Sequence, residues 1–308
     1  MLLLLSYKDN IMVLEKRKFM YTLFTDTDTD ITLEEAKKFG YKLISMPYCV
    51  DGKEVYPYED YEVFDYESFY GNLREGIIPT TCAISPVKYI EYFEEEFKNG
   101  KDILYVHFSK AMSGTFNAMN IAYEELKERY PERKLYTIDT KGITILSNLI
   151  VKEIGDMHLA GKSIEEIMVW ANNEVDHFAT YFFADNLDFF KRSGRVSNVS
   201  AFMGTIIGIK PIIYMDHEGM MTNITKERGR TKALNKLVKY VEELSVDIYN
   251  HRVIIGHTDS IELAKKLGAL LIEKYGESLK IEYVVVNPTA GSHCGPDAVG
   301  VAFYAKHK

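Results

Sequence analysis

Three short segments of this chain combine small hydroxyl residues or a histidine with glycine or proline. They are GSHCGP at residues 291–296, PTTC at 79–82 and SGT at 113–115. Glycine lets the backbone approach a bound group closely, and hydroxyl and imidazole groups supply hydrogen bonds. Such side chains suit the binding of one anionic head group if the fold brings the three segments together.

Two of these segments lie where parallel-sheet proteins commonly bind ligands. Ser113 follows the apolar run Ile103–Phe108, which is typical of a buried strand, and precedes a predicted helix. Thr81 lies just before another predicted helix, which begins at Ser85. Ligands of open parallel sheets bind beyond the carboxyl ends of the strands, where helix N–H groups favour an anion. A structural role explains these residues as well, because serine is an ordinary helix N-cap.

A histidine and an arginine are further candidates for the same site. His293 is flanked by Gly291, Gly295 and Pro296, and we expect a histidine in such a loop to face a site. Arg195 follows a short predicted helix and can bind a carboxylate or phosphate through two nitrogen atoms. The alternative for His293 is a purely structural role, and the alternative for Arg195 is an exposed basic turn.

The first half of the chain alternates predicted strands and helices. The strands are Met20–Phe24, Ile103–Phe108 and Leu135–Ile138, and the helices are Tyr66–Arg74, Ser85–Asn99, a segment from Ser113 to before Pro131, and Ile143–Leu159. Asp51 and Gly52 indicate a tight hairpin turn between Ile44–Val50 and Glu54–Tyr58. Alternation at this spacing predicts a doubly wound parallel sheet. Capping boxes at Thr32 with Glu35 and at Ser163 with Glu166 predict the starts of two further helices.

The pattern after residue 160 indicates a mixed α/β unit. The expected strands are Phe178–Ala184, Pro211–Tyr214, Met220–Ile224, Val253–Gly256, Ile281–Val286 and Ala298–Tyr304, and the expected helices are Gly229–Leu244 and Ile261–Lys274. A length of 308 residues with 46% hydrophobic content favours two domains. We predict an N-terminal α/β domain over 19–160 and a C-terminal α/β domain over 161–308. Residues 1–18 are expected to be a leader outside the fold.

The composition excludes several classes of protein. The 37 basic and 45 acidic residues give a net charge of −8, which argues against a nucleic-acid binder. The apolar run Met1–Leu5 is too short for a signal sequence or a membrane span. Three cysteines without metal-type spacing indicate a reduced, cytoplasmic protein with no metal site. Cys82 and Cys294 each lie in a candidate site segment, so these two thiols can meet in space.

One rival hypothesis is enzymatic. Asp26 and Asp28 match the Asp-x-Asp-x-Thr nucleophile motif of haloacid-dehalogenase-like phosphatases, directly after a predicted strand. A magnesium-dependent phosphatase also needs acidic metal ligands further along the chain, and no convincing motif for them is present.

Taken together, the motifs resemble the DegV family, which includes the fatty-acid-binding subunits of bacterial fatty acid kinase. The resemblance extends from about Phe19 to Tyr304. It is carried by TD at 25–26, PTT at 79–81, SGTF at 113–116, IDT at 138–140, SGRV at 193–196, IKP at 209–211 and HCGP at 293–296. It implies a two-domain α/β protein that holds a long-chain fatty acid in a tunnel between its lobes.

The resemblance also assigns roles to particular residues. Thr81 and Ser113 match the two hydroxyl residues that hold the carboxylate in the family, and His293 matches its histidine. Arg195 matches an arginine important to acyl-phosphate formation, which a separate kinase subunit carries out. The resemblance thus implies a carrier for fatty acid metabolism or lipid transport, without a cofactor or a catalytic nucleophile of its own. Cys82 departs from the serine that the family commonly has at this position, and a thiol is a poor hydrogen-bond donor.

The tail of the acid requires an apolar channel. The stripe Phe202, Met203, Ile206 and Ile207 follows the arginine segment and is expected to line this channel. Such stripes are more often part of a packed core, which is the alternative. A third hypothesis, a sensor of small carboxylates, would share the head-group site but have a closed tail pocket.

Overall fold

A computed structural model describes residues 21–197 and 208–308. The predicted leader therefore lies outside the described residues. So does the apolar stripe of Phe202, Met203, Ile206 and Ile207, and its role stays a prediction.

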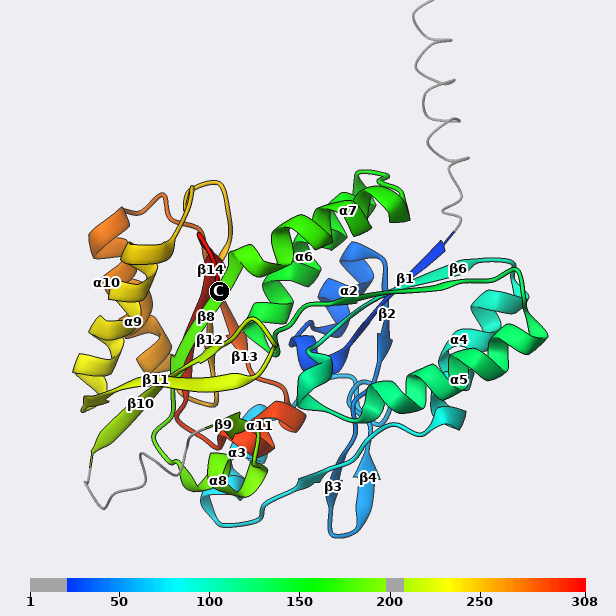
Figure 1. The fold of residues 1–308 in the computed structure, drawn as a ribbon. Helices are drawn as coiled ribbons and strands as arrows, with labels where there is room; N and C mark the ends of the chain where they lie inside the picture. Colours follow the sequence, from blue (N-terminus) through cyan, green and yellow to red (C-terminus); the bar gives the residue numbers. More distant parts are fainter. Residues whose placement is uncertain (1–20, 198–207) are drawn as a thin grey trace, which may run out of the picture.

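The N-terminal half forms a four-stranded parallel sheet, as the alternation of strands and helices predicted (Figure 1). Its strand order is β2-β1-β6-β7, and every neighbouring pair is parallel. The strands are β1 (Tyr21–Asp26), β2 (Tyr41–Ile44), β6 (Asp102–His107) and β7 (Leu135–Asp139). The chain leaves β1 toward β2 on one side and later returns to β6 on the other. The carboxyl ends of β1 and β6 therefore border a topological switch point, where doubly wound sheets bind ligands.

A seven-stranded mixed sheet forms the second half, in the order β13-β12-β14-β8-β10-β11-β9. Its strands are β8 (Phe178–Phe183), β9 (Val196–Ser197), β10 (Ile209–Met215), β11 (Met221–Arg228), β12 (Val253–His257), β13 (Ile281–Val285) and β14 (Val299–Tyr304). The β10–β11 hairpin closes through residues 216–219.

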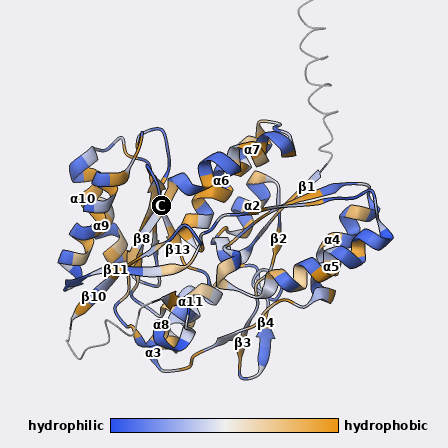
Figure 2. Cartoon of the chain, in the orientation of Figure 1, coloured by the Kyte–Doolittle hydropathy of each residue, from blue (hydrophilic) through white to orange (hydrophobic). Residues whose placement is uncertain are grey.

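Four of the described helices cover the outer faces of the two sheets. In Figure 2 these helices carry both hydrophilic and hydrophobic turns, which is the expected pattern for amphipathic helices with one face on a sheet. They are α4 (Pro86–Lys98) and α5 (Thr115–Arg129) on the first sheet, and α9 (Arg230–Leu244) and α10 (Ile261–Tyr275) on the second. Helices α2 (Leu33–Phe39) and α7 (Ile164–Glu174) begin with the capping boxes Thr32–Glu35 and Ser163–Glu166, as predicted.

Helix α6 (Ile145–Leu159) lies between the two sheets. It contacts η1 (Thr27–Thr29) at the end of β1 and strands β8, β12 and β14 of the second sheet. Buried residues occur around its whole circumference, as expected of a helix packed on both sides. The largest cluster of buried apolar side chains includes residues from both halves, so the boundary at residue 160 stays a prediction.

A small third sheet lies beside these two, in the order β4-β3-β5. Its strands are β3 (Tyr48–Val50), β4 (Lys53–Val55) and β5 (Thr80–Thr81), and the short helices α3 (Tyr66–Arg74), α8 (Asp188–Ser193) and α11 (Pro288–Cys294) lie near it (Figure 1). The predicted turn at Asp51–Gly52 is confirmed. The predicted strand Ile44–Val50 is wrong, because β2 ends at Ile44 and Pro47, which has no N–H group, precedes β3. Among the described residues, no helix is long and apolar enough to cross a membrane.

Candidate ligand-binding site

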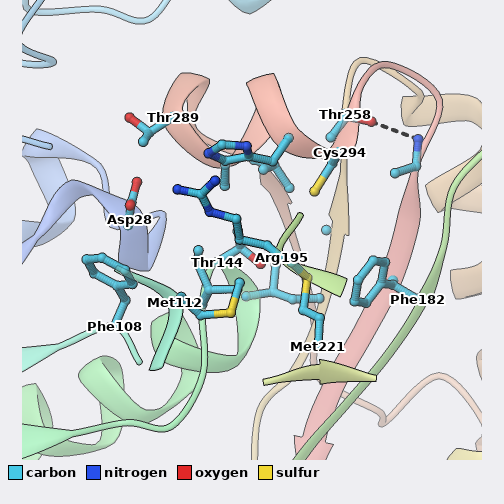
Figure 3. A pocket seen from close by; sticks show the side chains of 18 of the residues that line it. Asp28, Phe108, Met112, Thr144, Phe182, Arg195, Met221, Thr258, Thr289 and Cys294 are labelled. Carbon is cyan, nitrogen blue, oxygen red and sulfur yellow. Dashed lines mark hydrogen bonds between the residues drawn. The ribbon is translucent and has the colours of Figure 1, made fainter. Parts of the chain in front are cut away.

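A cavity lies between the carboxyl edge of the parallel sheet and the seven-stranded sheet. It contains about 970 Å³ of empty space, part of which opens to solvent. Figure 3 shows Phe108, Met112, Phe182 and Met221 around it, with the Arg195 side chain among them. Its other apolar lining residues include Met46, Ile143, Ile145, Met215, Val286, Ala298 and Val299. The wall is thus mainly apolar, with a few polar groups.

All four of the predicted site residues line this cavity: Thr81, Ser113, Arg195 and His293. They come from β5, the segment before α5, the segment after α8, and α11. The Thr81 hydroxyl lies 3.0 Å from Nε2 of His293, within hydrogen-bonding distance. The fold therefore brings together segments that are far apart in the sequence.

The expectation that His293 lies in a loop is wrong. His293 is in the last turn of α11, whose N-cap is Asn287 and whose first residue is Pro288. The Asn287 side chain accepts a hydrogen bond of 2.9 Å from the Ala290 N–H group, which stabilises the first turn. The helix fixes the direction of the imidazole more firmly than a loop would.

The His293 imidazole is neutral at neutral pH. Burial, followed by the nearby positive charge of Arg195, lowers the pKa of His293 to about 4. A neutral imidazole donates through one nitrogen atom and accepts through the other. When Nε2 carries the proton, it donates to Thr81 Oγ1, and the Thr81 O–H group is then free to donate to an anion.

Ser113 presents a second hydroxyl group to the cavity. It has an extended backbone between the 3-10 helix η2 (Lys110–Met112) and α5. Its Oγ accepts a hydrogen bond of 3.2 Å from the Thr115 N–H group. Because the oxygen is the acceptor in this bond, the hydroxyl proton remains available for a ligand.

Arg195 supplies the positive charge of the site. It follows α8 and Gly194, whose φ of 63° lies in the left-handed region that favours glycine. One guanidinium nitrogen of Arg195 donates to the Ser193 carbonyl oxygen at 2.6 Å, which leaves its other N–H groups for a ligand.

Asp28 is a cavity residue that sequence reasoning did not assign to ligand binding. It follows β1 at the switch point, is almost fully buried and faces the cavity (Figure 3). Burial, with the charges of Asp26 and Asp30, raises its pKa well above the usual range. Within the described part of the chain, its Oδ1 atom has no hydrogen-bond partner. Its position at the end of a parallel strand, as with Ser113, was the signal that could have identified it.

The phosphatase hypothesis gains no support from this geometry. Asp26 is fully buried, and its carboxylate accepts hydrogen bonds from the Tyr105 hydroxyl and the N–H groups of Phe108 and Asp28. A nucleophile must reach its substrate. Among the described residues, the group with the geometry of a metal site is Cys49, Glu54 and Cys82, which includes neither aspartate.

The thiol beside Cys82 is that of Cys49, at a sulfur–sulfur distance of 2.6 Å. Cys82 and Cys294 both line the cavity, so both lie at the candidate site as expected. The thiol in contact with Cys82 comes from Cys49 because β5 pairs with β3, which carries Cys49.

Comparison with known proteins identifies the family. The model of the DegV family, described as uncharacterised proteins, matches residues 20–306. The chain belongs to the DegV family. It is 34% identical over 289 residues to the DegV domain-containing protein CPE0026 of Clostridium perfringens, covering 94% of this chain and 98% of that protein.

Solved DegV structures share the fold. A stearic acid-binding protein from Eubacterium ventriosum matches with a TM-score of 0.80 and 21% identity, over 93% of this chain and 98% of that one. A DegV family protein from Eubacterium eligens, loaded with heptadecanoic acid, matches with a TM-score of 0.79 and 22% identity, over 93% and 100% of the two chains. At this level of identity, the similarity establishes the α/β architecture of the DegV fold.

Proposed function

We propose that this DegV protein binds one long-chain fatty acid in the cavity between its two larger sheets. The carboxylate lies at Thr81, Ser113, His293 and Arg195, and the tail extends along the apolar wall. The observation that carries this proposal is the convergence of these four residues at one mainly apolar cavity. The acids held by the DegV proteins of Eubacterium ventriosum and Eubacterium eligens support the choice of ligand.

The apolar wall provides the driving force for binding. A tail of about 14 buried methylene groups gains on the order of 11 kcal/mol at about 0.8 kcal/mol for each group. Association costs about 4–15 kcal/mol, so the affinity depends on how completely the tail is enclosed. An apolar wall of this extent favours a long-chain acid over the small carboxylates of the sensor hypothesis.

The polar residues determine the orientation of the acid. Burying a carboxylate without hydrogen-bond partners is costly. The hydroxyl groups of Thr81 and Ser113 and the guanidinium group of Arg195 are donors that can satisfy it. His293 holds the Thr81 hydroxyl in place and adds no charge of its own at neutral pH.

The site also supports presentation of the head group to a partner. A second, more open depression is lined by Lys110, Asn117, Asn120 and Gly194, and it shares Met112, Ser113 and Arg195 with the inner cavity. A kinase subunit bound over this depression would reach the carboxylate without removing the tail. We therefore infer a carrier that offers the acid to a fatty acid kinase, with Arg195 beside the transferred phosphoryl group.

Affinity as a function of chain length tests the proposal. Acetate, octanoate and palmitate are titrated against protein freed of lipid, by displacement of a fluorescent fatty acid. Each added methylene group is expected to raise the affinity about fourfold until the cavity is full. Equal affinity for acetate and palmitate would support a sensor of small acids and contradict the proposal.

A further inference from the structure

Two cysteines form a close pair at the edge of the cavity. Cys49 is on β3, where it pairs with Thr80 of the antiparallel strand β5, and Cys82 directly follows β5. Because side chains on a strand alternate between faces, Thr80 and Cys82 point to the same face, and Cys49 points there as well. Their Sγ atoms are 2.6 Å apart, and both residues are half-buried.

This distance favours a bond between the two sulfur atoms over a shared metal ion. The carboxylate of Glu54 lies close enough to complete a three-ligand set with the two thiols. Two thiolates on one tetrahedral zinc ion, each at about 2.3 Å, would be about 3.8 Å apart. The thiols are much closer than this, and the Glu54 carboxylate already accepts a hydrogen bond of 2.8 Å from the Tyr56 hydroxyl.

We propose that Cys49 and Cys82 form a reversible disulfide that ties β5 to β3 and slows the exchange of the ligand bound at Thr81. The formation of the disulfide concerns the two thiols alone. Its effect on ligand exchange rests on the proposed function. Disulfides of this kind in reducing compartments are transient and regulatory.

The position of β5 explains why a crosslink would affect the ligand. The strand contains only Thr80 and Thr81, and it pairs with Cys49 and Tyr48 of β3. Thr81 contacts His293, and both Thr81 and Cys82 line the cavity. A ligand that leaves past this wall requires β5 to move. A bond from Cys82 to Cys49 restrains that movement at the residue next to Thr81.

The reaction requires an oxidant, for which we specify a low-molecular-weight disulfide such as oxidised glutathione. The Cys49 thiolate attacks this disulfide, forms a mixed disulfide and displaces one small thiolate. The Cys82 thiolate then attacks the Cys49 sulfur and displaces the second. The two protons lost by the cysteines convert both displaced thiolates to thiols, so the cysteine pair is oxidised and the small disulfide is reduced.

The surroundings of Cys82 make its thiol a slow nucleophile at neutral pH. Burial, the neighbouring Cys49 and the charge of Glu54 raise the pKa of the Cys82 thiol to about 11. The thiolate is the attacking species, so attack by Cys82 is slow at neutral pH and accelerates as the pH rises. The Glu54→Gln variant is expected to form the disulfide faster, because it removes one negative charge.

The test begins with the mass of the intact protein. Zinc-free, reduced protein is incubated with oxidised glutathione, and we expect it to lose two hydrogen atoms in a bond that peptide mapping assigns to Cys49 and Cys82. The Cys294→Ala variant should behave in the same way, whereas Cys49→Ala and Cys82→Ala should stop at a glutathione adduct or remain unmodified. The disulfide would be refuted if both thiols stayed free after this treatment. It would also be refuted if the purified protein contained stoichiometric zinc and resisted oxidation.

The release of a fluorescent fatty acid tests whether the disulfide slows ligand exchange. Dissociation from the oxidised protein is expected to be several-fold slower than from the reduced protein, and dithiothreitol should restore the faster rate. Cys49→Ala should release the ligand at one rate under both conditions. A disulfide that leaves release unchanged would overturn its control of the ligand. Failure of the reduced protein to bind the fatty acid would instead refute the proposed function, and the mass result would stand independently.

Discussion

The Thr81 hydroxyl lies 3.0 Å from Nε2 of His293, although 212 residues separate them in the sequence. This contact joins β5 of the small sheet to α11. It places one hydroxyl group and one neutral imidazole at the same end of the cavity, beside Arg195. We therefore expect this end of the cavity to hold the carboxylate.

Replacing Thr81 by valine keeps its shape and removes its hydroxyl group. We expect Thr81→Val to weaken fatty acid binding by about 5–150-fold, because a buried charged acceptor loses a donor worth about 1–3 kcal/mol. Displacement of a fluorescent fatty acid measures this change. The exposed neighbour Thr80 provides the control, and Thr80→Val should bind normally. Equal affinities of the two variants for the fatty acid would contradict the role of Thr81 in binding the carboxylate.

Ser113→Ala should weaken fatty acid binding by a comparable amount or change the orientation of the acid. The reason is that the free proton of the Ser113 hydroxyl group is the second donor to the carboxylate. The control is Ser163→Ala, which removes the N-cap of α7 and should lower stability by about 1 kcal/mol without affecting affinity. Calorimetry and ligand titration of both variants separate the two effects. Unchanged affinity and chain placement in Ser113→Ala would contradict its assigned role.

The His293 imidazole should titrate near pH 4, and NMR of its ring protons can measure this directly. The pKa of His293 is lowered in the folded protein. The contribution of the neutral ring to the free energy of unfolding is therefore complete above about pH 6.5. That contribution is lost as the pH falls through about 4. Arg195→Met should raise the pKa by removing the nearby positive charge. A normal His293 pKa that does not respond to Arg195→Met would contradict the proposed surroundings of the ring.

The buried acids after β1 predict a second effect of pH. Burial raises the pKa of Asp26 and of Asp30 to about 7. Burial, followed by the charges of Asp26 and Asp30, raises the pKa of Asp28 well above its usual range. A raised carboxyl pKa favours the protonated folded state, so stability falls as the pH rises from about 4 through 7. Asp28→Asn should therefore unfold at a higher temperature than the unaltered protein at pH 8, with a smaller difference at pH 4.

Asp26→Asn provides the contrast for this prediction. The Asp26 carboxylate accepts bonds from two N–H groups and one hydroxyl group, and an amide nitrogen cannot replace a carboxylate oxygen as an acceptor. This variant should be destabilised at both pH values. If Asp28→Asn were equally destabilised, the assignment of Asp28 as an acid without an internal partner would be wrong.

Arg195 is expected to act in transfer to the kinase as well as in binding. With a fatty acid kinase subunit, ATP and enough palmitate to saturate the variant, Arg195→Met should form much less acyl phosphate, which hydroxylamine traps as a hydroxamate. Arg192→Met is the matched control, because Arg192 is an exposed residue of α8 and its guanidinium group stacks on the Phe189 ring. Equal product from both variants would refute the role of Arg195, and no product from the unaltered protein would refute presentation to this kinase.

Local signals in the sequence predicted much of the fold. Both capping boxes and the bounds of α3 depend on residues within one helical turn and were confirmed. The resemblance to the DegV family selected Thr81, Ser113, Arg195 and His293, which line one cavity, although their binding roles remain predictions. Strand pairing between distant segments was harder to predict, and the β3–β5 pair that brings Cys49 to Cys82 is an example.

The error at His293 has an identifiable physical cause. Gly291 and Gly295 suggested a loop open to a ligand, but a side chain at Gly291 would collide with the Tyr70 hydroxyl of α3. Gly295 has a φ of 71° and packs closely on Phe189 of α8. These glycines therefore serve helix packing and helix termination. The Asn287–Pro288 pair was the available signal that a helix begins there.

A crystal structure of the protein with palmitate would show directly where the carboxylate and the tail lie. We expect one acid in the cavity, with its carboxylate within hydrogen-bonding distance of the Thr81 and Ser113 hydroxyl groups and its tail along Phe182 and Met221. An empty cavity at saturating palmitate, or a carboxylate placed away from Thr81 and Ser113, would contradict this expectation.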